Sequence, residues 1–156
     1  GDLEQAGKGR NFAQGQDAVN GTLCLMCHRM GEEGGSVGPD LTAVASRFSR
    51  QAILESIIEP SKVVSEQYAN TDITLKNGSV LTGRIVSDTD DKLILRPSML
   101  APDTQEIRKA DIKTKEFSEV SPMMPGLLNT LTKEEILDLL AYFEAAGKSD
   151  GVAFKN

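Results

Sequence analysis

The sequence predicts a mainly α-helical fold that is interrupted by a small antiparallel β-module. Apolar residues recur at helical spacing toward both ends of the chain, whereas residues 70–118 alternate polar and apolar side chains between turn signals. We therefore expect one helical domain formed by residues 1–69 and 119–156, with residues 70–118 inserted as a β-rich segment. A chain of 156 residues has room for one small domain with a sizeable insertion.

Three helices are expected. The first opens near residues 9–13 and runs toward Cys24, with Phe12 packed in the core against the last helix. The second covers residues 41–59 and stops before Pro60, and one of its faces carries the apolar residues Ile53, Leu54, Ile57 and Ile58. The third covers residues 131–143.

The last helix carries the clearest signals. Thr132 and Glu135 have the spacing of a capping box. An apolar stripe follows, and Gly147 is a plausible end signal. We expect this helix to pack on the first helix.

The β-module is expected to contain five short strands. Asn77-Gly78 between alternating segments is a strong hairpin signal. The pattern is typical of a curled, barrel-like sheet, similar to Sm or SH3 domains. Mixed charges without an aromatic platform give it no nucleic-acid face, so it is a structural insertion or a docking surface.

The chemistry of the chain is concentrated in Cys24-Leu25-Met26-Cys27-His28, which is the C-x-x-C-H attachment signature of a c-type haem. Two thiols about one turn apart match the two vinyl groups on one porphyrin edge. The adjacent imidazole can reach the iron as the proximal ligand. The chain has 2 cysteines and 1 histidine, and all three lie in this pentapeptide.

Other uses of a C-x-x-C pair fit less well. A zinc site normally needs four protein ligands, and no further cysteine or histidine is present. A thioredoxin-like site needs a βαβ context, which is missing around the motif. A disulfide between Cys24 and Cys27 remains an alternative in a chain without haem.

Three further groups are candidates for a haem pocket. The Pro39 carbonyl, in a glycine-rich loop, is a candidate acceptor for the second N–H of His28, although an ordinary turn has the same pattern. Arg47 either pairs with a haem propionate or is solvated. Met123 and Met124 lie between two prolines, and a thioether sulfur suits haem iron; the alternative is methionine as a gap filler.

The net charge of −6 and the pI of about 4.8 argue against a nucleic-acid partner and favour a partner with a basic patch. No run of about 18 apolar residues is present, so we expect no membrane span. No signal peptide is visible at the first residues. Because haem is attached covalently outside the cytoplasm, we expect a periplasmic or otherwise exported protein, as a mature form or an excised domain.

Taken together, the segments resemble a class I c-type cytochrome. The resemblance is carried by Gly9 with Phe12, the C-x-x-C-H motif, Gly38-Pro39-x-Leu41, Met124-Pro125, and the closing helix with Tyr142-Phe143. It implies a helical fold around one covalently bound haem c, with Pro39 and Leu41 in the haem pocket. It also implies His28 and a methionine as axial ligands. The ligand methionine of such proteins stands directly before a proline, which indicates Met124, with Met123 as the alternative.

A narrower resemblance concerns residues 55–61, the β-rich insertion and Met124-Pro125-Gly126-Leu127. These are similar to the haem-binding cytochrome c domains of exported planctomycete and verrucomicrobial proteins. The resemblance implies a possible fusion to a larger exported enzyme.

The expected function is therefore electron transfer by an iron that cycles between Fe(III) and Fe(II), and not enzyme catalysis. With His28 on the iron, no free histidine remains for acid–base chemistry. Two alternatives stay open. If neither methionine binds, the open sixth site suits a gas sensor or a peroxidase-like enzyme; alternatively, the chain is the docking module of a larger exported dehydrogenase.

Overall fold

The computed structural model describes residues 1–155 and divides the chain into two compact units. Gly1–Pro60 and Pro125–Asn156 form the first, which we call the helical unit. Ser61–Met124 form the second, which we call the sheet unit. The sheet unit is longer at both ends than the segment 70–118 that was delimited from the sequence.

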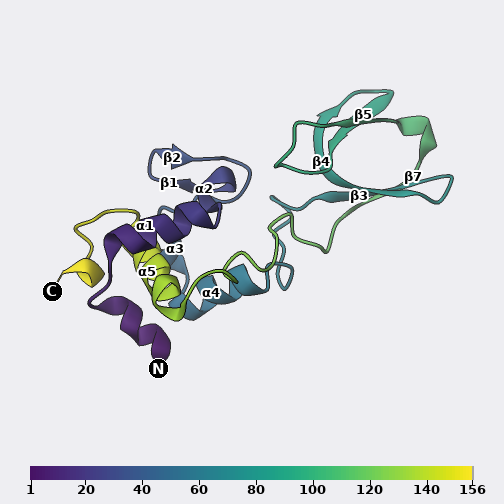
Figure 1. Ribbon diagram of the computed structural model, residues 1–156. Coiled ribbons are helices and arrows are strands. Elements are labelled where there is room, and N and C mark those ends of the chain that lie inside the picture. The colour runs from purple at the N-terminus through teal and green to yellow at the C-terminus, as the bar shows by residue number, and fades with distance from the viewer. Residues whose placement is uncertain (156) are drawn as a thin grey trace. The chain divides into compact units, whose positions relative to one another are not determined.

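The helical unit contains short helices and one small hairpin. Its 3-10 helices span Asp2–Gly7 and Val152–Phe154, its α-helices are α1 (Phe12–Gly21), α2 (Cys24–Cys27), α3 (Val44–Arg47), α4 (Arg50–Ile58) and α5 (Lys133–Glu144), and its hairpin pairs β1 (Arg29–Met30) with β2 (Glu33–Gly34). Figure 1 shows α5 crossing α1.

The crossing of α1 and α5 is close because α1 carries a glycine there. A Cβ atom on Gly15 would collide with the backbone carbonyl oxygen of Asp138 on α5. Beside it, the rings of Phe12 and Tyr142 lie 5.5 Å apart between centroids, which confirms the predicted packing of Phe12 against the last helix.

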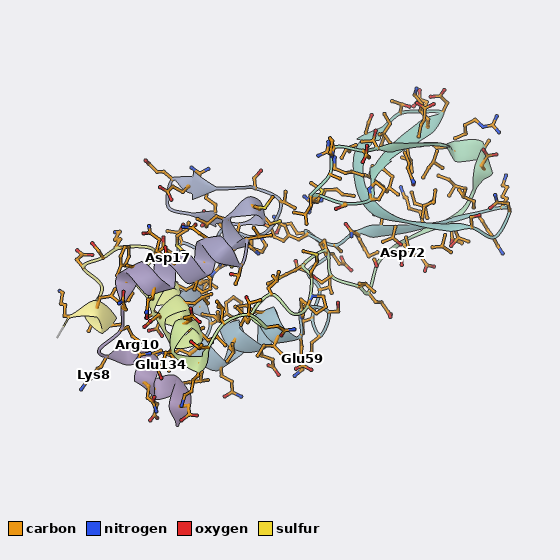
Figure 2. The ribbon with its side chains drawn as sticks, viewed as in Figure 1. Lys8, Arg10, Asp17, Glu59, Asp72 and Glu134 are labelled. Carbon is orange, nitrogen blue, oxygen red and sulfur yellow. The ribbon has the colours of Figure 1, made fainter. Side chains whose placement is uncertain are left out.

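Asp138 also ties the start of α1 to α5. The residue is only 3% exposed, and its Oδ1 accepts a hydrogen bond of 3.0 Å from the backbone N–H of Asn11. Arg10 lies 3.6 Å from the same carboxylate and forms an ion pair of 3.0 Å with Glu134 (Figure 2). Burial of a carboxylate costs desolvation free energy unless the group is paired. These contacts offset that cost for Asp138 inside the helical unit.

The single helix predicted over residues 41–59 is wrong. The structure has two helices there, because Phe48 is extended (φ −129°, ψ 143°) between α3 and α4. Ser49 then caps α4 by accepting a hydrogen bond from the backbone N–H of Ala52. A serine hydroxyl competes with the helical ladder in this way, and it favours a helix start over a helix interior.

Helix α5 follows its sequence signals closely. Thr132 is the N-cap, and Thr132 and Glu135 form the expected capping box. The helix ends at Glu144, and the N–H of Gly147 (φ 72°) bonds to the carbonyl of Tyr142 at 3.0 Å. The first left-handed residue after the helix is Ala146 (φ 52°), whose N–H bonds to the carbonyl of Phe143 at 3.1 Å, so Ala146 and Gly147 close the last turn together.

The sheet unit is built on five antiparallel strands in the order β6-β5-β4-β3-β7. The strands are β3 (Thr71–Leu75), β4 (Val80–Asp88), β5 (Lys92–Arg96), β6 (Gln105–Arg108) and β7 (Ile112–Phe117). Register shifts in the pairing of β3 with β7 and of β4 with β5 accompany a strong curl, visible in Figure 1. The curl encloses a core of its own, formed by Ile73, Leu93, Leu95 and Ile107.

The predicted fold class, a mainly α class I cytochrome c fold with a β insertion, is wrong for this chain. About 33% of the structure is helix and 21% is strand, and only 3 helices within residues 1–155 have seven or more residues. The physical reason is twofold: the middle helical segment is interrupted at Ser49, and the β segment has a separate core. No helix within the described residues has the length and hydropathy that a membrane span requires.

Candidate functional site

The two cysteines lie on the single turn of α2. Residues three apart on a helix share one face, so both sulfur atoms belong to the same side of this turn. Both are free thiols; Cys24 is buried and Cys27 is half-buried. Burial raises the pKa of the Cys24 thiol above its ordinary value.

The two residues between α1 and α2 hold Cys24 in place. Leu23 has left-handed backbone angles (φ 62°, ψ 20°), which turn the chain sharply into α2. The buried Thr22 hydroxyl donates to the carbonyl of Ala18 at 2.8 Å and lies 3.3 Å from the sulfur of Cys24. Because its own hydrogen is committed to Ala18, the hydroxyl oxygen faces the thiol as an acceptor.

His28 follows α2 in an extended conformation (φ −108°, ψ 149°). Its Nδ1 lies 2.7 Å from the carbonyl oxygen of Pro39, which is the acceptor suggested by the sequence. A carbonyl oxygen only accepts, so the ring proton is on Nδ1 and the lone pair is on Nε2. This is the tautomer that a metal-binding imidazole with a fixed orientation needs.

The glycine-rich loop packs directly against the motif. A Cβ atom on Gly38 would lie 2.7 Å from Cε1 and 2.9 Å from Nδ1 of the His28 ring. Cβ atoms on Gly34 and Gly35 would collide with the backbone carbonyls of His28 and Met26. This packing role of the glycines was not predicted from the sequence. The several glycines that directly follow the C-x-x-C-H motif could have indicated it.

Backbone hydrogen bonds hold the loop in that position. Gly38 donates its N–H to the carbonyl of Cys27 at 2.7 Å, and Gly35 donates to the carbonyls of Leu25 at 2.9 Å and His28 at 3.2 Å. These bonds attach the loop to the backbone of the motif. They therefore help to hold the Pro39 carbonyl next to the His28 ring.

Two other predicted pocket residues lie near this loop. Leu41 is half-buried, and its N–H donates to the carbonyl of Arg29 at 2.8 Å. Arg47 is exposed, its guanidinium carbon lies 5.9 Å from the centre of the Phe48 ring, and its charge contributes to the lowered pKa of Asp40. A propionate partner for Arg47 remains a prediction.

The two candidate methionine ligands belong to the sheet unit, whereas the motif belongs to the helical unit. Met124 is 46% exposed and Met123 is half-buried. The N–H of Met123 donates to the hydroxyl of Ser121 at 3.1 Å. The structure thus brings together Cys24, Cys27, His28 and Pro39, and the methionine ligand remains a prediction.

The donor set and its surroundings fit a haem better than a bare metal ion. Within residues 1–155 no group of three or more His, Cys, Asp and Glu side chains converges on one point. The helical unit also leaves large apolar side chains about half exposed, at Leu23 (47%), Met26 (53%), Phe48 (54%) and Ile58 (54%). Leu23 and Met26 flank the cysteines, where a large apolar group attached to both sulfurs would cover them.

A small cavity of about 60 Å³ lies beside α4. It is lined by Ile57, Ile58, Gly126, Leu127, Leu128 and Asn129. The cavity thus lies between α4 and the segment that follows Met124-Pro125, and its walls are mainly apolar.

Comparison of the chain with models of protein families and with curated proteins gives no match. The resemblance to c-type cytochromes therefore rests on the residues of this chain alone.

Proposed function

We propose that the chain is a monohaem c-type electron carrier. The observation that carries the proposal is the state of His28: its Nδ1–H is held by the Pro39 carbonyl at 2.7 Å, next to two free thiols on one helical turn. The free lone pair of Nε2 and both sulfurs belong to one short segment, as covalent haem attachment with a proximal imidazole requires.

In this proposal each residue has a defined role. Cys24 and Cys27 would hold the haem through thioether bonds, and His28 would bind the iron through Nε2. Met124 would supply the second ligand to the iron, with Met123 as the alternative. Leu41 and Pro39 line the proximal side, and Arg47 binds a propionate through its guanidinium.

Haem iron bound by histidine and methionine supplies one-electron exchange between Fe(III) and Fe(II) at a raised potential. The chain's own contribution is to orient His28, to surround the site with apolar side chains, and to present charge to a partner. Apolar surroundings disfavour the extra positive charge of the ferric state, which moves the potential in the same direction.

The charge distribution supports a partner with a basic docking patch. The helical unit has 13 acidic and 8 basic side chains, whereas the sheet unit has 10 and 9. The helical unit therefore carries most of the negative charge, and this would steer encounters at low salt. Covalent attachment of haem implies a periplasmic or otherwise exported location.

The decisive experiment is production of the chain in a host that matures c-type cytochromes, followed by mass spectrometry under denaturing conditions. We expect the mass of one haem to remain bound, and we expect Cys24→Ser with Cys27→Ser to abolish this. A redox titration with optical spectra then gives the ligation and the potential. A chain that keeps no haem after denaturation would contradict the proposal.

The sixth ligand is tested separately with two matched variants. A ferric haem with histidine and methionine ligands shows a weak absorption band in the far red. We expect Met124→Ala to abolish that band and Met123→Ala to keep it. The opposite result would assign the ligand to Met123, and absence of the band from the unaltered protein would favour an open sixth site.

A further inference from the structure

The segment after Pro39 is held by a short chain of side-chain hydrogen bonds. The hydroxyl of Thr42 accepts a hydrogen bond of 2.8 Å from the backbone N–H of Gly31. It lies 2.6 Å from Oδ1 of Asp40, and it must be the donor there because a carboxylate only accepts. The N–H of Thr42 donates to the same oxygen at 2.8 Å.

These bonds join the two segments that carry the His28–Pro39 contact. Gly31 follows β1, which begins directly after His28, and Asp40 follows Pro39. The N–H of Leu41 adds a parallel backbone bond to Arg29 at 2.8 Å. Thr42 therefore closes a ring of contacts around the imidazole and its carbonyl acceptor.

The charge on Asp40 strengthens this arrangement. The hydrogen bonds from Thr42 hold the pKa of the Asp40 carboxyl below its usual range, and the nearby charges of Arg29 and Arg47 act in the same direction. An ionised acceptor shortens and strengthens the bond from the Thr42 hydroxyl, which in turn becomes a better acceptor for Gly31.

We propose that Thr42, acting with Asp40 and Gly31, is a positioning residue that holds the Pro39 carbonyl against Nδ1 of His28. The inference rests on the proposed function insofar as His28 is an iron ligand. A stronger bond at Nδ1 makes Nε2 more basic, and a more basic ligand stabilises Fe(III). Thr42 then lowers the reduction potential of the iron within the range that histidine and methionine ligands allow.

The test uses Thr42→Val, which keeps the shape of the side chain but removes the two hydrogen bonds of the hydroxyl, to Gly31 and Asp40, while the backbone N–H bond to Asp40 stays. Gly31 and Asp40 are exposed, so water can replace the lost partners and the fold should survive. Thr42→Ser keeps the hydroxyl and should behave like the unaltered chain. Thr89→Val is a matched control, because Thr89 makes the same kind of bond to Asp91, at 3.1 Å, in the sheet unit.

The first measurement needs no haem. The nitrogen-15 shifts of the neutral His28 ring in the full chain give the ratio of the Nδ1–H to the Nε2–H tautomer. We expect that ratio to fall at least about threefold in Thr42→Val and to stay unchanged in Thr42→Ser and Thr89→Val. Asp40→Asn should give a smaller change in the same direction, and it serves if Thr42→Val does not fold.

The second measurement is the potential of the haem-loaded chain. Removal of a direct hydrogen-bond partner of a ligand typically changes metal affinity or activity by about 10–100-fold, and Thr42 acts one contact further away, so we expect a smaller effect. We expect the ratio of Fe(II) to Fe(III) at a fixed potential to rise by about 3-fold to 10-fold in Thr42→Val, where tenfold corresponds to about 59 mV.

The two measurements separate the two ideas. An unchanged tautomer ratio and an unchanged potential in Thr42→Val would overturn the role of Thr42 and leave the proposed function intact. If the chain takes up no covalent haem, the proposed function fails. The tautomer ratio then still decides whether Thr42 positions the ring.

Discussion

Gly38 packs directly against the imidazole ring of His28. A Cβ atom at this position would lie 2.7 Å from Cε1, 2.9 Å from Nδ1 and 3.2 Å from Nε2. Contacts this short are not tolerated, so either the ring or the loop would have to move. The contact between the ring and the Pro39 carbonyl therefore depends on the absence of a side chain at Gly38 as well as on the hydrogen bond.

Gly38→Ala should loosen His28. We expect the helical unit to lose about 1–3 kcal/mol of stability, the usual cost of forcing an extra carbon into a packed site. We also expect the Nδ1–H tautomer of His28 to lose its dominance in nitrogen-15 spectra. Ser36→Ala, an exposed position in the same loop, is the control and should change neither property. A Gly38→Ala chain with unaltered stability and tautomer would show that the ring is not confined.

Local signals in the sequence predicted the parts of the fold that depend on neighbouring residues. The capping box of Thr132 and Glu135 is one example, and the hairpin around Asn77-Gly78 is another, with Gly78 at φ 89°. In both cases the hydrogen bonds join residues a few positions apart, so the pattern itself contains the interaction.

The features that the sequence did not predict depend on distant partners. Asp138 is buried because Asn11 and Arg10, more than a hundred residues earlier, supply its partners. At Ser49 the side-chain hydroxyl caps a new helix, although the apolar pattern of this segment predicted one long helix. The fold class failed for the related reason that alternation predicted the strands but not the separate core that they enclose.

Gly15→Ala tests the close crossing of α1 and α5. Alanine favours a helix over glycine by about 1 kcal/mol, so a free surface position would be stabilised. At Gly15 the new carbon would meet the carbonyl of Asp138, and we expect a net loss of about 1–3 kcal/mol in urea unfolding followed by circular dichroism. Gly21→Ala, in the last position of α1, has open space around it and should be neutral or stabilising. Equal stability of the two variants would contradict a tight crossing.

The capping box makes the stability of α5 depend on pH. The N–H and hydroxyl of Thr132 both donate to the Glu135 carboxylate and hold its pKa below the usual value. A lowered pKa in the folded state gives stability that is fully present above the unfolded pKa of about 4.3 and is lost as the pH falls through the folded value. We expect Glu135→Gln to unfold at a lower urea concentration than the unaltered chain at pH 7.

The same comparison at low pH is the check on that mechanism. The difference between Glu135→Gln and the unaltered chain should begin to shrink as the pH falls below the unfolded pKa of about 4.3, and it should level off only below the folded value, where the native carboxylate is protonated as well. Glu119→Gln, which changes an exposed glutamate in the sheet unit, should show no such dependence. A difference that stays constant from pH 7 to acid would mean that the charge of Glu135 contributes nothing.

The two thiols should differ in reactivity before haem is attached. Cys24 is 7% exposed and burial raises its pKa, whereas Cys27 is more accessible. Since the thiolate is the nucleophile, we expect alkylation of Cys24 in a Cys27→Ser chain to be at least about tenfold slower at pH 7 than alkylation of Cys27 in a Cys24→Ser chain. The rate at Cys24 should continue to rise at a pH well above about 8.5, where an ordinary thiol is already fully ionised and its rate no longer changes. In urea the two rates should become equal, because the difference comes from the fold; equal rates in the native chains would mean that α2 does not bury Cys24.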